Sequence, residues 1–205
     1  MNIITIASNK GGAGKSTLAV NLAVALYGLK KSVVIIDLDP QGTASRWSRQ
    51  RETDDPDVLA IQAHQLDGVL ESARKHGADY ALIDTAPHSE TTALAACRVA
   101  DLVVVPCRPS LPDIDAIKHT VDLLAIAKSP GHIVINAAKT VGSKLDGKEA
   151  LQMSGLPLVP VVISDRIAFN HAFTAGLGVV EYDSTSKAAQ EISQLTKWLV
   201  TELKS

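Results

Sequence analysis

The sequence predicts an α/β fold, a doubly wound and mainly parallel sheet with helices on both faces. Short β-branched runs alternate with helix-length segments through all 205 residues, and this alternation favours parallel strands. Several runs are apolar at successive positions, as in VVII and LVVV, which is typical of strands that helices cover on both faces. Ligands of such sheets bind at the carboxyl ends of the strands, so the chemistry is expected directly after each strand.

Seven segments have the composition of strands. They are Ile3–Ala7, Ser32–Asp37, Val58–Gln62, Tyr80–Asp84, Leu102–Pro106, Ile133–Asn136 and Val159–Ser164. The first expected helix is Ser16–Tyr27, and the last is Ser186–Lys204. One stripe of the last helix is apolar, which favours packing on the sheet, and it consists of Ala188, Ile192, Leu195, Leu199 and Leu203. We expect one domain over residues 1–205, because no repeat or linker divides the chain and Gly142–Lys148 is its most loop-like insertion.

Composition and charge are those of a globular protein. Apolar residues make up 46% and charged residues 20%, and the net charge is −2. A protein that coats nucleic acid with its whole surface would be more basic, so any DNA contact is expected from a local patch. The start of the chain lacks the basic region and apolar run of a signal peptide, and no stretch reaches the roughly 20 apolar residues of a membrane span. We therefore expect a cytoplasmic location.

A glycine-rich loop follows the first expected strand and reads NKGGAGKST from Asn9 onward. The strict GxxxxGK[ST] pattern requires glycine where this chain has asparagine, so the loop departs from it by one residue. Gly11, Gly12 and Gly14 allow successive backbone N–H groups to turn toward phosphate oxygens. The helix that starts near Ser16 points the positive end of its dipole at the same anion. The loop therefore predicts a phosphate site.

Side chains of the loop complete a nucleotide and magnesium site. Lys15 reaches the β- and γ-phosphates as a point charge, and the Ser16 hydroxyl ligates Mg²⁺. Thr17 is expected at the α-phosphate. The nucleotide-binding residues expected from this loop are Gly11, Gly12, Ala13, Gly14, Lys15, Ser16 and Thr17. The implied cofactors are ATP and Mg²⁺.

Aspartates stand at the ends of two expected strands beside this loop. Asp37 and Asp39 belong to DLDPQG, and Asp84 ends YALID. An aspartate directly after an apolar run costs free energy in a core unless it is paired or faces a cation. Asp84 is therefore expected to hold Mg²⁺ through water.

KGGAGKST, followed by VVIIDLDPQG and YALIDTAP, resembles the ParA/MinD family of deviant Walker ATPases. Within that P-loop NTPase family the chain is most similar to short ParA partition proteins that lack an N-terminal DNA-binding domain. The resemblance covers nearly the whole chain and ends with EYDSTSKAAQEI. It implies a weak ATP hydrolase that a partner protein stimulates, and that partitions DNA or protein cargo.

The resemblance also implies residue roles. Lys10 is the lysine that crosses the dimer interface to the partner's nucleotide, and it joins Lys15 and Asp39 as the catalytic residues. Asp39 matches the position that orients the attacking water. Asp37 matches a supporting carboxylate in the magnesium shell, beside Ser16 and Asp84. For adenine, Asn136 and Pro160 are the expected contacts, with Val161, Asp165 and Arg166 nearby.

The implied partners are a second copy in the ATP state, non-specific DNA, and a ParB-like or cargo-adaptor protein at the nucleoid. The candidate DNA contacts are Arg46, Arg49, Arg51, Lys144, Lys148, Lys187 and Lys197. Three other functions stay open. A MinD-like ATPase at a membrane surface needs a basic amphipathic tail, which is not evident, so no membrane is expected. A redox or metal-cluster ATPase needs Cys97 and Cys107 to converge. A metabolic P-loop ligase would lack the DLDPQG motif, which this chain contains.

Overall fold

The computed structural model of the protein describes residues 1–139, 149, 151–152 and 154–204. The expected loop Gly142–Lys148, with Lys144 and Lys148, lies outside these residues. The strands are β1 (Asn2–Ile6), β2 (Val33–Asp37), β3 (Asp57–Ala60), β4 (Tyr80–Asp84), β5 (Leu102–Cys107), β6 (Gly131–Ala138) and β7 (Leu158–Ser164). The helices are α1 (Lys15–Gly28), α2 (Thr43–Ser48), η1 (Ala63–Gln65), α3 (Leu66–Lys75), α4 (Glu90–Arg98), α5 (Leu111–Ala127), α7 (Ile167–Thr174), α8 (Val179–Tyr182) and α9 (Lys187–Glu202).

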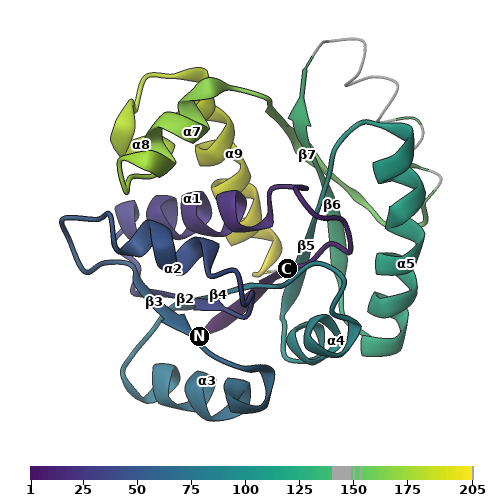
Figure 1. Ribbon diagram of the computed structural model, residues 1–205, viewed down its shortest axis with the longest axis horizontal. Coiled ribbons are helices and arrows are strands. Elements are labelled where there is room, and N and C mark those ends of the chain that lie inside the picture. The colour runs from purple at the N-terminus through teal and green to yellow at the C-terminus, as the bar shows by residue number, and fades with distance from the viewer. Residues whose placement is uncertain (140–148, 150, 153, 205) are drawn as a thin grey trace.

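The described strands form one sheet in the order β3-β2-β4-β1-β5-β6-β7, and every neighbouring pair is parallel. This confirms the predicted doubly wound α/β fold (Figure 1). The register pairs Ile6 with Asp84, and Asp84 with Asp37. The carboxyl ends of three central strands therefore lie side by side, directly below the loop that leaves β1.

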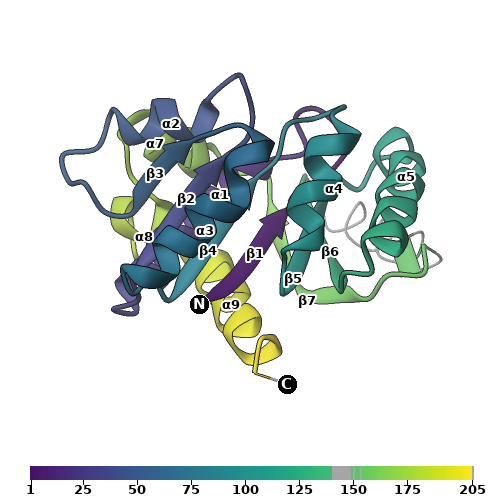
Figure 2. The same ribbon diagram turned by 90° about the horizontal axis from the view of Figure 1, so that it is seen from below.

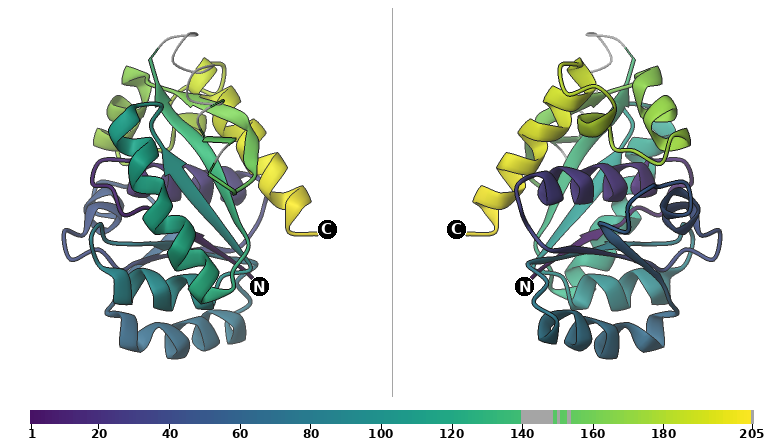
Figure 3. Two further views of the ribbon diagram at one scale, coloured as in Figure 1. Left: turned by 90° about the vertical axis from the view of Figure 1, so that its right-hand side faces the viewer. Right: turned by 90° about the vertical axis from the view of Figure 1, so that its left-hand side faces the viewer.

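Alternate side chains of the strands pack into two helical layers. Ile4, Ile35 and Leu82 belong to a core that includes α1, α2 and α7–α9. Their sequence neighbours Ile3 and Ile36 point to the other face, where α3 and α4 cover the sheet. The two layers lie on opposite sides of the strands in the turned views (Figures 2 and 3). Strands covered on both faces explain the unbroken apolar runs of the sequence.

The last helix packs into the core, as its apolar stripe predicts. α9 begins one residue after Ser186, whose hydroxyl accepts a hydrogen bond from the Ala189 N–H at 3.1 Å. Ile192, Leu195 and Leu199 are fully buried in the cluster that holds α1. A serine N-cap of this kind contributes about 1 kcal/mol. Over the described residues, the longest apolar helical stretches fall short of what a membrane crossing requires.

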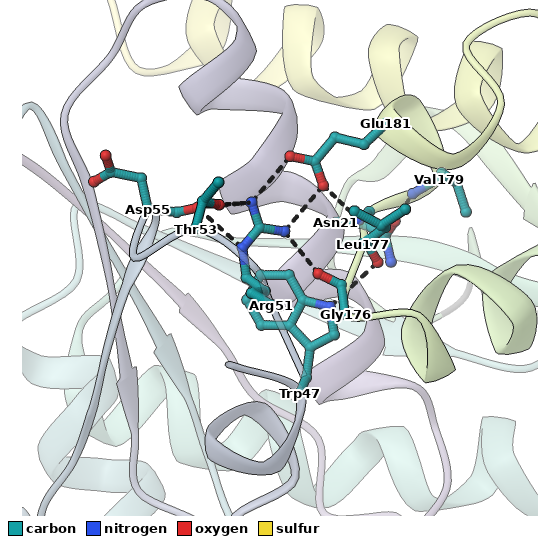
Figure 4. Close-up of polar contacts among 10 residues, drawn as sticks. Asn21, Trp47, Arg51, Thr53, Asp55, Gly176, Leu177, Val179 and Glu181 are labelled. Carbon is teal, nitrogen blue, oxygen red and sulfur yellow. Dashed lines mark hydrogen bonds and ion pairs between the residues drawn. The ribbon is translucent and has the colours of Figure 1, made fainter. Parts of the chain in front are cut away.

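Arg51 is a structural residue of this layer, and its prediction as a DNA contact is wrong. Its side chain is only 3% exposed and forms a bidentate ion pair with Glu181, with both N···O distances 3.0 Å. It also donates to the carbonyls of Gly176 and Asp55 and stacks over Trp47 at 4.7 Å (Figure 4). The arginine therefore fastens the loop after α2 to the segment between α7 and α8.

Replacing Arg51 tests whether its side chain holds these two segments together. Burial raises the pKa of Glu181, but the hydrogen bonds from Arg51 and the Gly178 N–H outweigh it and hold that pKa below its usual value. Arg51→Gln leaves this carboxylate without its cation, and we expect a loss of about 2–4 kcal/mol in chemical unfolding. The exposed Arg49→Gln is the matched control, expected to change stability by less than about 0.5 kcal/mol. Equal effects of both substitutions would contradict the assignment.

Candidate nucleotide site

The loop between β1 and α1 has the backbone of a phosphate cradle. Gly12 and Gly14 have φ of 71° and 93°, a left-handed region that glycine enters without strain. Gly14 is the residue before α1, so the helix N-terminus opens directly onto the loop. Backbone N–H groups at a helix start attract an anion. The structure thus brings Gly11, Ala13, Ser16 and the other expected loop residues together at the carboxyl edge of the sheet.

Asn136 supports this loop from β6. It is 6% exposed, and its Nδ2 donates to the Ala13 carbonyl at 2.7 Å. A Cβ at position 14 would overlap the Asn136 amide, so glycine is required there for space as well as for backbone angle. β6 extends to Ala138, and Asn136 lies inside the strand rather than at its end. The structure therefore shows Asn136 as a support of the loop, and its expected adenine contact stays a prediction.

Lys15 is the buried cation of the site. It is 6% exposed, and its Nζ donates to the Lys10 carbonyl at 3.2 Å. Burial lowers the pKa of Lys15, while Asp84 and Asp39 act to raise it. Lys10 itself is half-buried, and within the described chain its ammonium forms no hydrogen bond or ion pair. Two lysines thus stand at one loop, one held inside and one available to a ligand.

Asp84 is the most deeply buried carboxylate of the site. It is fully buried, and neither of its oxygens has a hydrogen-bond partner of good geometry among the described residues. Burial raises the pKa of Asp84 to about 7, although the nearby Ser16 side chain lowers it. A buried carboxylate without partners fits a cation or its water shell. The residues present therefore fit Mg²⁺, with Ser16 and Asp84 as the holding groups.

Magnesium would need ligands from the nucleotide as well. The described residues contain no group of three or more His, Cys, Asp or Glu that could hold a metal alone. Mg²⁺ in nucleotide sites is commonly bound by one or two carboxylates together with substrate phosphates. The donor set therefore fits a metal that arrives with a nucleotide rather than a resident ion.

Asp37 has a different environment from Asp84, although both are buried strand ends. One of its oxygens accepts from the Asp39 N–H at 3.1 Å. The other accepts from the Ser45 N–H at 3.0 Å and from the Ser45 hydroxyl at 2.7 Å. Asp37 thus ties the start of α2 to β2 and fixes the backbone of Asp39, whose own carboxylate accepts from the Gln41 N–H. Ser45 was not foreseen, because no sequence pattern marks a serine eight residues after an aspartate.

A hollow beside the loop is the candidate base pocket. Its lining residues come from α1 and from the carboxyl ends of β6 and β7, and they include Gly12, Thr17, Leu18, Asn136, Ala137, Asp165, Arg166 and Phe169. Arg166 is fixed there by Glu191, with an Nη2···Oε1 distance of 2.7 Å. Pro160 does not line this hollow and is exposed. It lies near the start of β7, in an irregular part of the β6–β7 pairing, so the structure gives no support to its expected adenine contact, which stays a prediction.

Both cysteines are buried thiols, which disfavours the redox alternative. Cys97 lies in α4 and Cys107 ends β5, and both are free. Burial raises the pKa of each thiol to about 12. A thiolate ligand for a metal cluster at an interface needs exposure and a lower pKa, and neither cysteine has them.

Comparison with known proteins shows a family of nucleotide-binding domains. The model of the CobQ/CobB/MinD/ParA nucleotide binding domain matches residues 4–180. A curated relative, "Maintenance of carboxysome distribution protein A" from Gloeobacter kilaueensis, is 30% identical over 88% of this chain and 84% of its own length.

Two solved structures share the fold. One is the ATP complex of an aspartate-to-alanine variant of Cyanothece McdA, with a TM-score of 0.80 and 17% identity over 97% of this chain and 96% of that one. The other is the cell division ATPase MinD of Pyrococcus furiosus, with a TM-score of 0.81 and 22% identity over 98% and 99% of the two chains.

Gly14→Ala tests the shape of the loop without any ligand. The new Cβ would displace the Asn136 amide, and a left-handed φ costs a residue with a Cβ roughly 1–2 kcal/mol. We expect a loss of about 1–3 kcal/mol in chemical unfolding of the nucleotide-free protein. Gly11→Ala is the control, since no atom lies within 4 Å of its Cβ position, and it should leave stability nearly unchanged. A harmless Gly14→Ala would show that Asn136 does not support the loop.

Asp84→Asn tests the unpartnered carboxylate. Because its folded pKa is raised to about 7 from 3.8, Asp84 lowers stability progressively as pH rises from 4 to 7. We expect Asp84→Asn to stabilise the nucleotide-free protein by about 2–4 kcal/mol at pH 8 and hardly at pH 4, in thermal unfolding. Asp37→Asn, which removes a hydrogen-bonded carboxylate, should destabilise by about 1–3 kcal/mol. If both variants lost stability at pH 8, our account of Asp84 would fail.

Proposed function

This chain belongs to the CobQ/CobB/MinD/ParA nucleotide-binding family, and from that membership we propose that it is an ATP hydrolase that dimerises around MgATP to position cargo. The cargo is DNA, as a plasmid or chromosome, or a protein assembly. In the ATP state the dimer binds DNA non-specifically, and a ParB-like or cargo-adaptor protein stimulates weak hydrolysis. The relative named for carboxysome distribution supports a positioning role, and the ATP complex of the Cyanothece McdA variant supports the nucleotide.

The observation that carries the proposal is the arrangement of charge around the phosphate loop. Buried Lys15 and half-buried Lys10 stand at the loop, and Asp84 offers two buried oxygens to which no described residue donates with good geometry. A polyphosphate with a divalent cation complements both features, because the lysines meet the phosphates and the carboxylate meets the metal shell. The base then occupies the hollow beside Asn136 and Arg166.

In this proposal each residue has one task. Lys15 holds the β- and γ-phosphates, and Lys10 reaches across the dimer to the partner's nucleotide, where a second cation stabilises the charge of the departing phosphoryl group. Asp39, fixed through Asp37, orients the attacking water. Mg²⁺, when bound at Ser16 and Asp84, neutralises phosphate charge. Catalysis of this kind depends on positioning and electrostatics.

We place the protein in the cytoplasm, as a single domain associated with the nucleoid. The membrane alternative needs a free amphipathic helix at the surface. The apolar stripe of α9 is already used, since Ile192, Leu195 and Leu199 are buried against α1 and the sheet. The proposed role therefore includes no membrane.

The experiment that tests the function is retention of the purified protein on non-specific duplex DNA with ATP, ADP or no nucleotide, at two salt concentrations. Binding that requires ATP and weakens with salt supports a DNA-associated positioning ATPase, because phosphate contacts release counterions. If ATP dimerises the protein but DNA is never bound, the DNA part of the proposal is wrong, and binding to lipid vesicles becomes the next measurement.

Asp39→Ala tests the water-positioning role. We expect MgATP to bind with little change and the ATP dimer to accumulate, while hydrolysis falls by at least about 100-fold, the usual contribution of a positioned base. Asp115→Ala, an exposed aspartate on α5, serves as the control. Phosphate release and sedimentation in the same samples give the two readouts. Normal turnover by Asp39→Ala would remove this residue from the catalytic set.

A further inference from the structure

Two exposed arginines of α2 face one groove. Arg46 and Arg49 are three residues apart and both line it, so they share one side of the helix, with Cβ atoms roughly 5–6 Å apart. Among the described residues, the Arg46 guanidinium contacts only the Thr43 hydroxyl, at a long 3.4 Å. The Arg49 guanidinium forms no hydrogen bond or ion pair with any residue the structure describes. Both cations are therefore available to a ligand.

Besides the arginines, the groove has two acidic lining residues, Asp37 and Asp39, and otherwise polar and apolar side chains. Its opposite wall is η1 with the end of β3, and its other polar lining comprises Gln41, Ser45, Gln62, His64, Gln65 and Thr92. Its apolar members are Leu38, which is only 5% exposed, half-buried Ile61, and the small residues Pro40, Ala60 and Ala63. Protein partners usually dock through a large anchor such as Trp or Tyr, and the described lining contains no Trp, Tyr or Phe. Amides, hydroxyls and arginines are instead the groups that contact phosphate and sugar in nucleic-acid complexes.

We propose that the α2 groove binds the sugar–phosphate backbone of DNA, with Arg46 and Arg49 on neighbouring phosphates. The inference rests on the proposed function and names the DNA contact that it requires. Acidic residues follow α2 in sequence, but Asp54, Asp55 and Asp57 do not line the groove. Of the other described candidates, Lys197 borders a different hollow beside Tyr27, Lys187 begins α9 and does not line the groove, and the side chain of Arg51 is buried.

The groove is joined to the nucleotide edge by hydrogen bonds. Its lining includes Asp37 and Asp39, whose carboxylates repel DNA phosphates, so the phosphates are expected on Arg46 and Arg49. Ser45, the residue before Arg46, donates both its N–H and its hydroxyl to Asp37. A movement of residues 37–45 at the phosphate edge therefore also moves Arg46 and Arg49. Through this connection, a bound nucleotide alters the affinity of the groove for DNA.

The test compares two double variants of the full chain with equal loss of charge. Arg46→Gln with Arg49→Gln removes the groove cations, and Arg74→Gln with Arg98→Gln removes exposed arginines of α3 and α4 on the other face of the sheet. Binding of a fluorescent non-specific duplex is measured with ATP over a salt series, and ATP-dependent dimerisation is measured separately. For the groove variant we expect affinity to fall at least about tenfold and the salt slope to become shallower by about 0.9 per lost phosphate contact.

The inference is supported if the control double variant keeps wild-type affinity and both variants dimerise with ATP. It is overturned if the groove variant binds DNA like the wild type, or if both variants weaken equally, which would indicate net charge alone. Loss of partner-stimulated hydrolysis with DNA binding intact would also overturn it, and would assign the groove to a protein. If the wild type binds no DNA although ATP dimerises it, the DNA part of the proposed function fails as well.

Discussion

Asp84 is fully buried at the end of β4, and among the described residues neither of its oxygens finds a hydrogen-bond partner of good geometry. A protein tolerates such a group only where its charge is used, because the desolvation lowers stability. The register of the sheet places it next to Ile6, directly below the loop that carries Lys15. The loop, its supporting Asn136 and the strand ends are arranged around this one carboxylate. In the proposed function, a cation and a polyphosphate complete this site, and the burial of Asp84 lowers the stability of the protein without them.

Asp37 shows how the same residue type serves the opposite purpose one strand away. Its two carboxylate oxygens accept hydrogen bonds from the Asp39 N–H and from the N–H and hydroxyl of Ser45. Asp37 therefore holds residues 39–45 in place. That segment continues into α2, whose exposed arginines line the groove. The proposed nucleotide site and the proposed DNA surface are therefore only a few residues apart in one hydrogen-bonded segment.

The fold and the position of the glycine-rich loop between β1 and α1 were predictable from sequence, because both depend on local patterns. Apolar runs mark strands buried on both faces, and KGGAGKST marks the loop. Contacts distant in sequence were not predictable. Arg51 looked like one of three surface arginines, yet it pairs with Glu181, 130 residues later. Pro160 lies near the start of the expected strand Val159–Ser164, as it does in β7, so the strand pattern gave no support to its expected adenine contact. Ser45 had no signature at all.

The central claim is that MgATP joins two chains into a dimer, in which Lys10 of each chain reaches the nucleotide of the other. The most direct test is a measurement of molecular mass by sedimentation. The 21.6 kDa chain is compared with its Lys10→Ala variant in MgATP and in MgADP. Our account predicts a dimer of the wild type in MgATP alone, and a variant that binds the nucleotide but stays a monomer. The same mass in every nucleotide state, or an unchanged dimer of Lys10→Ala, would contradict it.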